Sequence, residues 1–409
     1  MNRRALRTRI TEQAARIDRR TPGHRDRALD GLRALALLAV PTGHWLLGGL
    51  TRDPSGALHN ASPLTTFGHL APASWVLQML GLFFLVGGCA SALSYRRRAG
   101  STASWLKGRL VRLGRPVLGV TVVWALIAPL LHVAGVPLTT LRTAATLVVQ
   151  PLWFVGVYAV VTALTPYCVR ATRRLGGWAA APLICWVALV DLLRYGPVAG
   201  AVPGWLALLN LLPGWLFGYQ LGVSWGEGRI GRRGARLLLV GGTVLFVVLL
   251  AVFHYPPSMV GVPGAERTNS HPPSLLVLAL AAAQSGAAVL LRDRLARLLD
   301  RPLWWAPVVL VNLGAMTVLC WHQTAMLAAA VPGSFAGAVP GLTTAPDSPG
   351  WIVARAAWLP VFSVLLVVIA RHTRRFEAPP RAGRRFSVAR NLVAGVLAAL
   401  FASFALGLA

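Results

Sequence analysis

Eleven apolar segments follow one another along this 409-residue chain, each about 20 residues long, which is the length that a helix needs to cross a bilayer. Lipid offers backbone groups no partner outside the helix, so such segments fold as transmembrane helices. We therefore expect an all-α, polytopic membrane protein with about eleven transmembrane helices. The segments are residues 32–50, 73–95, 113–133, 143–166, 177–193, 204–223, 236–254, 274–291, 303–327, 351–370 and 389–408.

The composition excludes an ordinary soluble fold. Hydrophobic residues make up 56% of the chain and charged residues only 13%, whereas soluble domains have about 25% charged residues. The formal charge of +28 does not indicate a nucleic-acid-binding protein, because such proteins display basic patches on water-exposed domains, and this chain has no such domain. Lys107 is the sole lysine, so the basic charge is almost entirely arginine.

The arginines alternate along the chain in a way that predicts its orientation in the membrane. Nine lie between Arg3 and Arg27, and every second connection after that is arginine-rich, whereas the intervening connections carry almost none. The positive-inside rule then places the N-terminus in the cytoplasm of a multi-pass plasma-membrane protein and the C-terminus outside. The arginine-rich connections are 96–112, 170–174, 229–233, 292–301 and 371–390.

The sequence divides into a basic cytoplasmic tail, residues 1–28, and a transmembrane domain, residues 29–409. We interpret the tail as a topology-setting arm near anionic lipid rather than as a basic surface helix over 3–20. No cleavable signal peptide is expected, because the first apolar segment is long and has no small-residue cleavage pattern. The connection 255–273, rich in Pro and Gly, is too irregular for lipid, and we expect it to cap a cavity.

Two ionisable residues in the first predicted helix are candidates for chemistry, because charged groups within spans are costly. Arg33 and His44 are eleven residues apart, which is three turns, so they share one face about 16 Å apart along the axis. Asp30 can pair with Arg33. An imidazole can take a proton from a hydroxyl or accept an acyl group; the alternative, a hydrogen-bonded packing role for His44, stays open from this helix alone.

Arginines at a spacing of three begin the third predicted helix. Guanidinium groups at Arg109, Arg112 and Arg115 can grip the phosphates of a nucleotide-bearing donor. The positive-inside rule also places arginines here, and on spacing alone that explanation is favoured.

Other polar and aromatic residues have a plain structural interpretation. His322 lies near the end of the ninth segment, where an interfacial residue is common, although it can also line an acceptor site. Trp153 and Phe154 are typical of packing and belt residues, and Asp191 is a carboxylate near one end of the fifth segment. The nine histidines never fall in a metal-ligand spacing, so no metal is expected.

Residues 28–44 read A-L-D-G-L-R-A-L-A-L-L-A-V-P-T-G-H. This segment resembles the opening of the membrane acyltransferase-3 family, in which an arginine and a histidine share the first helix at this spacing. Three further segments agree in order, namely 83–98, 109–116 and 151–158. The family transfers acyl groups, often acetyl, from acyl-CoA to hydroxyls of sugars in envelope glycans, glycolipids or antibiotics.

The resemblance implies roles for four residues. His44 becomes the catalytic histidine, Arg33 its partner on the helix, and Arg109 and Arg112 the arginine pair near the donor site. In one place the chain departs from the family, because it has two glycines at 87–88 where a serine-glycine pair is usual, and we assign no role there.

These observations together predict an integral membrane O-acyltransferase. Acyl-CoA is its expected donor substrate rather than a bound cofactor, and a carbohydrate, glycolipid or glycosylated natural product its acceptor, with membrane lipid around it and no nucleic acid. A transporter or flippase for an anionic lipid or metabolite is the alternative, but intramembrane carboxylates are scarce and no repeats are visible. A polysaccharide polymerase is expected to have a large basic outward loop, and the connection 323–350 has no Lys or Arg.

Overall fold

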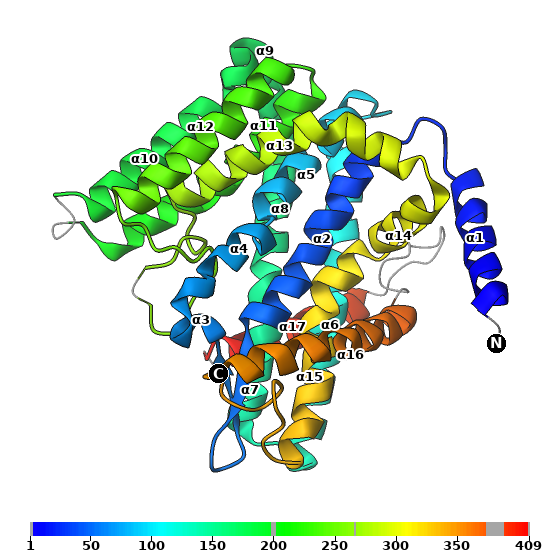
Figure 1. The fold of residues 1–409 in the computed structure, drawn as a ribbon, viewed down its shortest axis with the longest axis vertical. Coiled ribbons are helices and arrows are strands. Elements are labelled where there is room, and N and C mark those ends of the chain that lie inside the picture. The colour runs from blue at the N-terminus through cyan, green and yellow to red at the C-terminus, as the bar shows by residue number, and fades with distance from the viewer. Residues whose placement is uncertain (1–2, 198–201, 266, 374–387, 408–409) are drawn as a thin grey trace.

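The computed structural model describes residues 3–197, 202–265, 267–373 and 388–407, and most of these residues are helical. The helices are α1 Arg3–Arg19, α2 Arg27–Leu47, α3 Pro63–Thr66, α4 Ala71–Leu77, α5 Leu80–Arg96, α6 Thr102–Val133, α7 Leu138–Val149, α8 Trp153–Ala163, α9 Thr165–Leu175, α10 Ala181–Tyr195, α11 Leu211–Gly226, α12 Arg232–Ala251, α13 Leu275–Leu299, α14 Pro302–Leu313, α15 Ala315–Phe335, α16 Pro349–Thr373 and α17 Val388–Ala405. Short 3₁₀ helices are η1 Gly68–Leu70, η2 Gln150–Leu152, η3 Gly176–Ala180 and η5 Gly204–Asn210. The predicted all-α polytopic fold is confirmed (Figure 1).

Each of the eleven predicted segments contains helix, but fewer helices qualify as spans. In the described part of the chain, eight helical stretches are long and apolar enough to cross a membrane. A ninth span results if α14 and α15, bent by 76° at their junction, count as one. Two predicted spans are not among these: α2, which carries Asp30, Arg33 and His44, and α17, of which the apolar stretch with described side chains is Leu392–Ala405.

Helix α2 lies in the middle of the bundle and contacts α5, α13, α14, α15 and α16. Its start is capped by Asp26, whose Oδ1 accepts from the backbone N–H of Leu29 at 3.0 Å, as aspartate commonly does at an N-cap. The helix continues through Pro41 and ends at Leu47. This central position puts the candidate histidine deep inside the molecule.

A two-stranded antiparallel hairpin, β1 Gly49–Arg52 and β2 Leu58–Ala61, follows α2 directly. The sequence prediction extended the first span to residue 50, because Gly49 and Leu50 continue its apolar character. The turn signal D-P-S-G follows at residues 53–56, where Gly56 has φ +91°, a conformation that favours glycine. The hairpin marks one end of the bundle, which we call the hairpin end.

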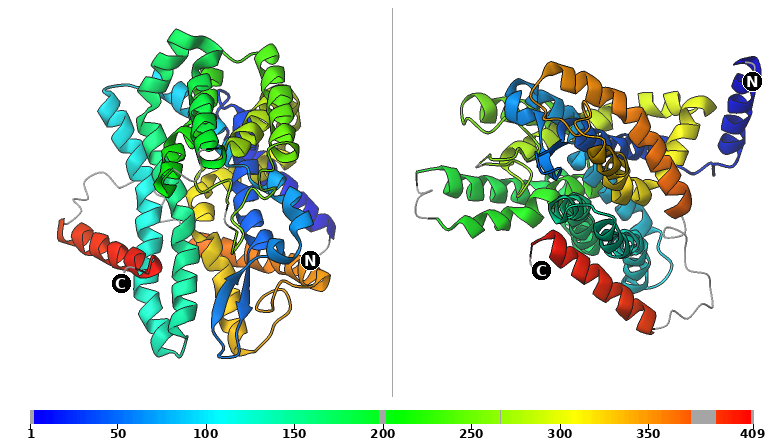
Figure 2. Two further views of the ribbon diagram at one scale, coloured as in Figure 1. Left: turned by 90° about the vertical axis from the view of Figure 1, so that its left-hand side faces the viewer. Right: turned by 90° about the horizontal axis from the view of Figure 1, so that it is seen from below.

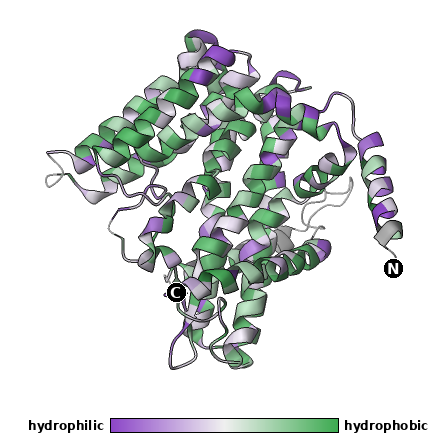
Figure 3. Ribbon diagram, viewed as in Figure 1, coloured by the Kyte–Doolittle hydropathy of each residue, from purple (hydrophilic) through white to green (hydrophobic). Residues whose placement is uncertain are grey.

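The opposite end, which we call the basic end, gathers arginine-rich termini. The starts of α2, α6 and α12 meet the ends of α5, α9 and α13 there, and hydrophilic residues are visible along it (Figure 3). An ion pair between Arg232 and Asp293 at 3.3 Å joins α12 to α13 at this end. The connections 96–112, 170–174, 229–233 and 292–301 thus lie at one end of the bundle; of the last arginine-rich connection, residues 374–387 lie outside the described residues.

Both chain ends lie at the periphery. The tail is the helix α1, so the interpretation of a non-helical arm is wrong; Trp305 donates through Nε1 to Thr21 at 2.7 Å just after it. Helix α17 lies across α6 and α7 (Figure 2).

Close helix contacts explain the glycine pair at 87–88. A Cβ on Gly88 would lie 2.0 Å from the carbonyl oxygen of Tyr219 on α11, and one on Gly87 would lie 2.6 Å from the ring of Tyr158. Small residues let helices approach in this way. The position that departs from the family pattern therefore packs tightly against α8 and α11.

Candidate functional site

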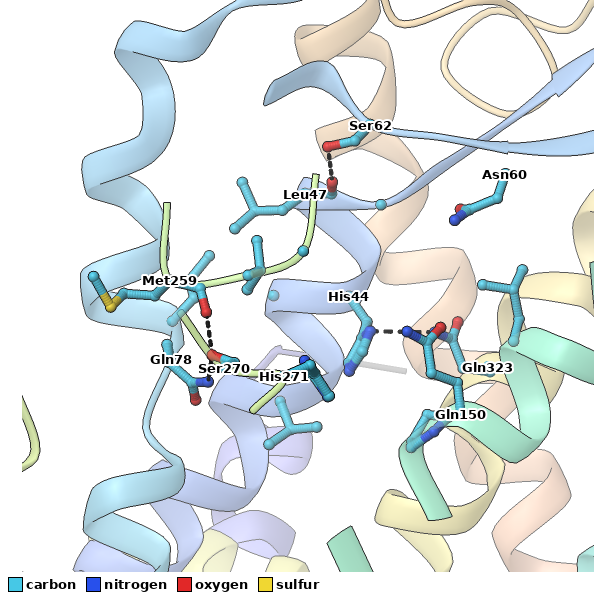
Figure 4. A pocket seen from close by; sticks show the side chains of 18 of the residues that line it. His44, Leu47, Asn60, Ser62, Gln78, Gln150, Met259, Ser270, His271 and Gln323 are labelled. Atoms are coloured by element: carbon cyan, nitrogen blue, oxygen red, sulfur yellow. Dashed lines mark hydrogen bonds between the residues drawn. The ribbon is translucent and has the colours of Figure 1, made fainter. Parts of the chain in front are cut away.

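A cavity of about 190 Å³ lies beside His44 near the hairpin end (Figure 4). Its walls come from α2, α4, the hairpin, η2, α8, α15 and the segment between α12 and α13. That segment, residues 252–274 without the undescribed residue 266, is called the strap. Since Met259, Ser270 and His271 of the strap line the cavity, the prediction that this connection caps a cavity is confirmed.

The imidazole of His44 is held by α15. Its Nδ1 lies 3.3 Å from Nε2 of Gln323, and Figure 4 shows this contact with His271 on the other side of the ring. The amide of Gln323 can present Nε2 as a donor or Oε1 as an acceptor, and each choice fixes the opposite tautomer of His44. With Oε1 toward Nδ1–H, the lone pair of His44 Nε2 is free to take a proton.

His322 is a second imidazole beside the first. Its ring centroid lies 5.1 Å from that of His44, and the side chain is only 1% exposed, so the expectation of an interfacial residue is wrong. Its Nδ1 lies 3.2 and 3.0 Å from the carbonyl oxygens of Val318 and Leu319; a carbonyl accepts, so Nδ1 carries the hydrogen. Its Nε2 therefore holds a lone pair, buried and without a partner among the described residues.

The strap is fixed over the cavity by side chains of α4. Trp75 Nε1 donates to the Pro257 carbonyl at 2.6 Å, and Gln78 Nε2 donates to Ser270 Oγ at 3.0 Å. His271 lies edge-on against Trp153, with ring centroids 4.8 Å apart, and its burial lowers the pKa of the imidazole. His271 thus lies in the wall as a neutral ring, and Trp153 lines the cavity rather than belonging to an aromatic belt.

Arg355 on α16 is a buried cation that the sequence analysis missed. It is 0% exposed, and its guanidinium donates to the carbonyls of Trp45 at 2.6 Å, Gly48 at 3.0 Å and Gly341 at 3.1 Å. Carbonyls at a helix C-terminus carry partial negative charge, so Arg355 stabilises the end of α2 next to His44. An arginine inside the predicted span 351–370 was the available signal.

A larger cavity, about 1220 Å³ in volume, lies at the basic end between the start of α2, the end of α5, the start of α6 and the end of α13. Charged residues are frequent in its wall. They are Arg25, Asp26, Arg27, Asp30, Arg97, Arg98, Arg292 and Asp300. Trp105 adds an aromatic surface.

The predicted arginines lie toward this basic end rather than beside His44. Arg33 pairs with Asp30 at 3.7 Å, as expected. Arg109 donates to Ser91 Oγ at 3.2 Å and its guanidinium is 4.8 Å from the Trp105 ring centroid. Arg112 is exposed. None of the three lines either cavity.

A comparison with models of protein families identifies the family of this chain. Residues 26–371, most of the chain, match the family model described as an acyltransferase domain. The chain belongs to the acyltransferase-3 family. It is accordingly a membrane acyltransferase of the O-acyltransferase type. Comparisons with curated proteins and with solved structures give no match.

The acyltransferase domain also contains a buried carboxylate, Asp191. It lies in a predicted span, where an ionisable group is energetically unfavourable. Its oxygens accept from Asn210 Nδ2 at 2.9 Å, from Tyr255 Oη at 3.1 Å and from the backbone N–H of Leu275 at 2.8 Å. The last contact caps the start of α13. Asp191 therefore joins α10, η5, the strap and α13, and it lines neither cavity of the acyltransferase domain.

Proposed function

We propose that this protein transfers an acyl group, acetyl in the first instance, from acyl-CoA to a hydroxyl of a carbohydrate, glycolipid or glycosylated natural product. His44 is the residue that activates the hydroxyl or carries the acyl group. The observation that supports this most is that one helix, α2, borders both cavities: His44 lines the one at the hairpin end, and Asp30 lines the charged one at the basic end.

The two cavities suit the two substrates. Fourteen residues separate Asp30 from His44, which is about 21 Å along a helix and comparable with the extended phosphopantetheine arm of CoA. The nucleotide end of the donor then lies at the basic end, where Arg97 and Arg98 in the cavity wall can bind phosphate oxygens. Arg33, Arg109 and Arg112 lie outside that wall, and we propose that Arg109 and Arg112 add to donor binding from the start of α6. The thioester reaches His44 from that side, and the acceptor enters from the hairpin end.

The chemistry balances with these groups alone. In the direct route, Nε2 of His44 takes the proton of the acceptor hydroxyl, the oxygen bonds to the thioester carbon, and the C–S bond breaks to release the CoA thiolate, which recovers the proton. In the alternative route, Nε2 attacks the thioester carbon, the C–S bond breaks and the CoA thiolate leaves. The acceptor oxygen then bonds to the acyl carbon, the C–N bond to Nε2 breaks, and the hydroxyl proton passes to the thiolate. In both routes Gln323 and His322 hold the ring in place.

The proposed orientation follows from the arginines. The basic end faces the cytoplasm, where acyl-CoA is made, and the protein spans the plasma membrane with a cytoplasmic N-terminus. The hairpin end and strap then face outward, toward envelope glycans. A transporter is less well supported, because no Asp or Glu among the described residues lines the cavity at the hairpin end.

Donor kinetics test the role of the arginine pair. Purified protein in nanodiscs is given acetyl-CoA and membrane extract as acceptor, and release of free CoA is measured. Arg109→Ala and Arg112→Ala are expected to raise KM for acetyl-CoA about 10-fold or more, whereas Arg174→Ala, an exposed arginine on α9, leaves it unchanged. Equal KM values in all three variants contradict donor binding by this pair.

A further inference from the structure

The wall of the cavity beside His44 is uncharged. Among the described residues that line it, the polar side chains are amides, hydroxyls and two imidazoles, and the remaining ones are apolar. The two imidazoles are His44 itself and His271, whose pKa is lowered by burial. By contrast, the cavity at the basic end has eight Asp or Arg residues in its wall.

Three charged residues near the cavity, Arg355, Arg52 and Asp53, are already engaged by the protein. Arg355, behind the end of α2, gives its donors to backbone carbonyls and is fully buried. In the hairpin, Arg52 donates to the Ser334 carbonyl at 2.9 Å, and Asp53 pairs with His59 at 2.8 Å. A charged group on a molecule in the cavity therefore finds no counter-ion among the described residues of the wall.

Charge complementarity decides what such a cavity accepts. Moving an ion out of water without a partner costs several kcal/mol, so the site discriminates strongly against a carboxylate or phosphate. The amides match the donors and acceptors of hydroxyl groups instead. Figure 4 shows Asn60, Gln78, Gln150 and Gln323 around the cavity near His44.

We infer that the residue acylated at His44 is an uncharged polyol ring, such as a neutral hexose or deoxyhexose, and not a uronic acid, a sialic acid or a sugar phosphate. This inference rests on the proposed function. It concerns the one ring that enters the cavity, so charges elsewhere on a long glycan are compatible with it.

The identity of the acylated residue tests the inference. Protein in nanodiscs is incubated with [14C]acetyl-CoA and membrane extract, the labelled product is cut into single residues by glycosidases, and the labelled residue is identified by electrophoresis and mass spectrometry. Label on an uncharged residue is the expected result, in at least about 100-fold excess over acidic residues. Label on a residue that itself bears a carboxylate or phosphate overturns it. Absence of any transfer together with absence of CoA release refutes the proposed function instead.

Variants that add a positive charge to the cavity wall test whether the wall selects the acceptor residue. Gln150 is exposed, and its side chain makes no hydrogen bond to the described residues. Gln150→Arg is therefore expected to fold and to raise the share of label on acidic residues about 10-fold or more. Gln150→Met is the uncharged control and should leave that share unchanged. Asn60→Arg, at the exposed hairpin position, tests the same change elsewhere in the wall. Unchanged shares in both arginine variants, folded and active, contradict selection by the wall.

Discussion

His44 and His322 lie ring to ring, with centroids 5.1 Å apart, at the junction of α2 and α15. The Nδ1–H of His322 donates to backbone carbonyls. The lone pair of this imidazole is therefore on Nε2, next to the His44 ring that performs the proposed chemistry. Two imidazoles this close interact electrostatically. The two rings therefore titrate as a coupled pair when His44 takes the proton of an acceptor hydroxyl. We therefore expect His322 to be a positioning residue that acts through His44.

Replacement of His322 tests this pair. His322→Asn keeps a donor near the position of Nδ1 and removes the Nε2 lone pair, so we expect kcat to fall about 10-fold or more, while KM for acetyl-CoA stays the same. The pH profile of kcat should also shift, which a purely structural role would not produce. His372→Asn, at the exposed end of α16, is the control. Unchanged kcat and pH profile in folded His322→Asn rule out the positioning role.

Two adjacent glycines in α12 predict opposite effects on stability. A Cβ on Gly242 would lie 2.6 Å from the backbone nitrogen of Ala283 on α13, whereas nothing lies within 4 Å of one on Gly241. Gly242→Ala should therefore push α12 from α13 and cost about 1–3 kcal/mol. Gly241→Ala should be neutral or slightly stabilising, because alanine favours helix. Thermal unfolding in detergent measures both, and equal melting temperatures contradict the packing.

Asp191 is expected to matter for stability and not for chemistry. Asp191→Ala leaves the buried amide of Asn210, the hydroxyl of Tyr255 and the capped N–H of Leu275 without their acceptor, so stability should fall by about 3 kcal/mol or more. Protein that remains folded should release CoA with an unchanged pH profile. Exposed Asp347→Ala is the control. A large kcat loss without destabilisation would instead assign Asp191 a catalytic role.

The strap should loosen in mild acid. Burial lowers the pKa of His271 in the folded protein, so the unfolded chain binds more protons at the same pH. Folding stability then falls as the pH drops below about 6.5, the ordinary imidazole value, and levels off below the folded-state pKa. His271→Gln cannot take the proton, so its melting temperature should decrease less between about pH 8 and pH 5. Identical pH slopes for the two proteins contradict this origin.

The sequence predicts the local part of the site well. Arg33 and His44 share a helix, and the 3.6-residue period relates them without knowledge of the rest of the chain. The irregular strap was recognised because Pro- and Gly-rich chain cannot face lipid. Small residues such as Gly87 and Gly88 predict that another helix approaches closely. They do not predict which helix it is.

The remaining part depends on contacts between distant segments. Gln323 and His322 reach His44 because α15 packs on α2, and no periodicity in either helix indicates that pairing. Arg355 was overlooked because its partners, the carbonyls at the end of α2 and at Gly341, are created by tertiary packing. The hairpin was obscured because the first two residues of its first strand, Gly49 and Leu50, continue the apolar run of the helix before it.

The central claim is that His44 carries acyl transfer, and release of CoA from acetyl-CoA tests it most directly. Wild-type protein and folded His44→Ala are compared in nanodiscs with membrane extract as acceptor. We expect turnover by the wild type and a loss of about 100-fold or more in the variant. Equal turnover by the two proteins, or no CoA release by the wild type with several acyl donors while it moves a lipid or solute, contradicts it.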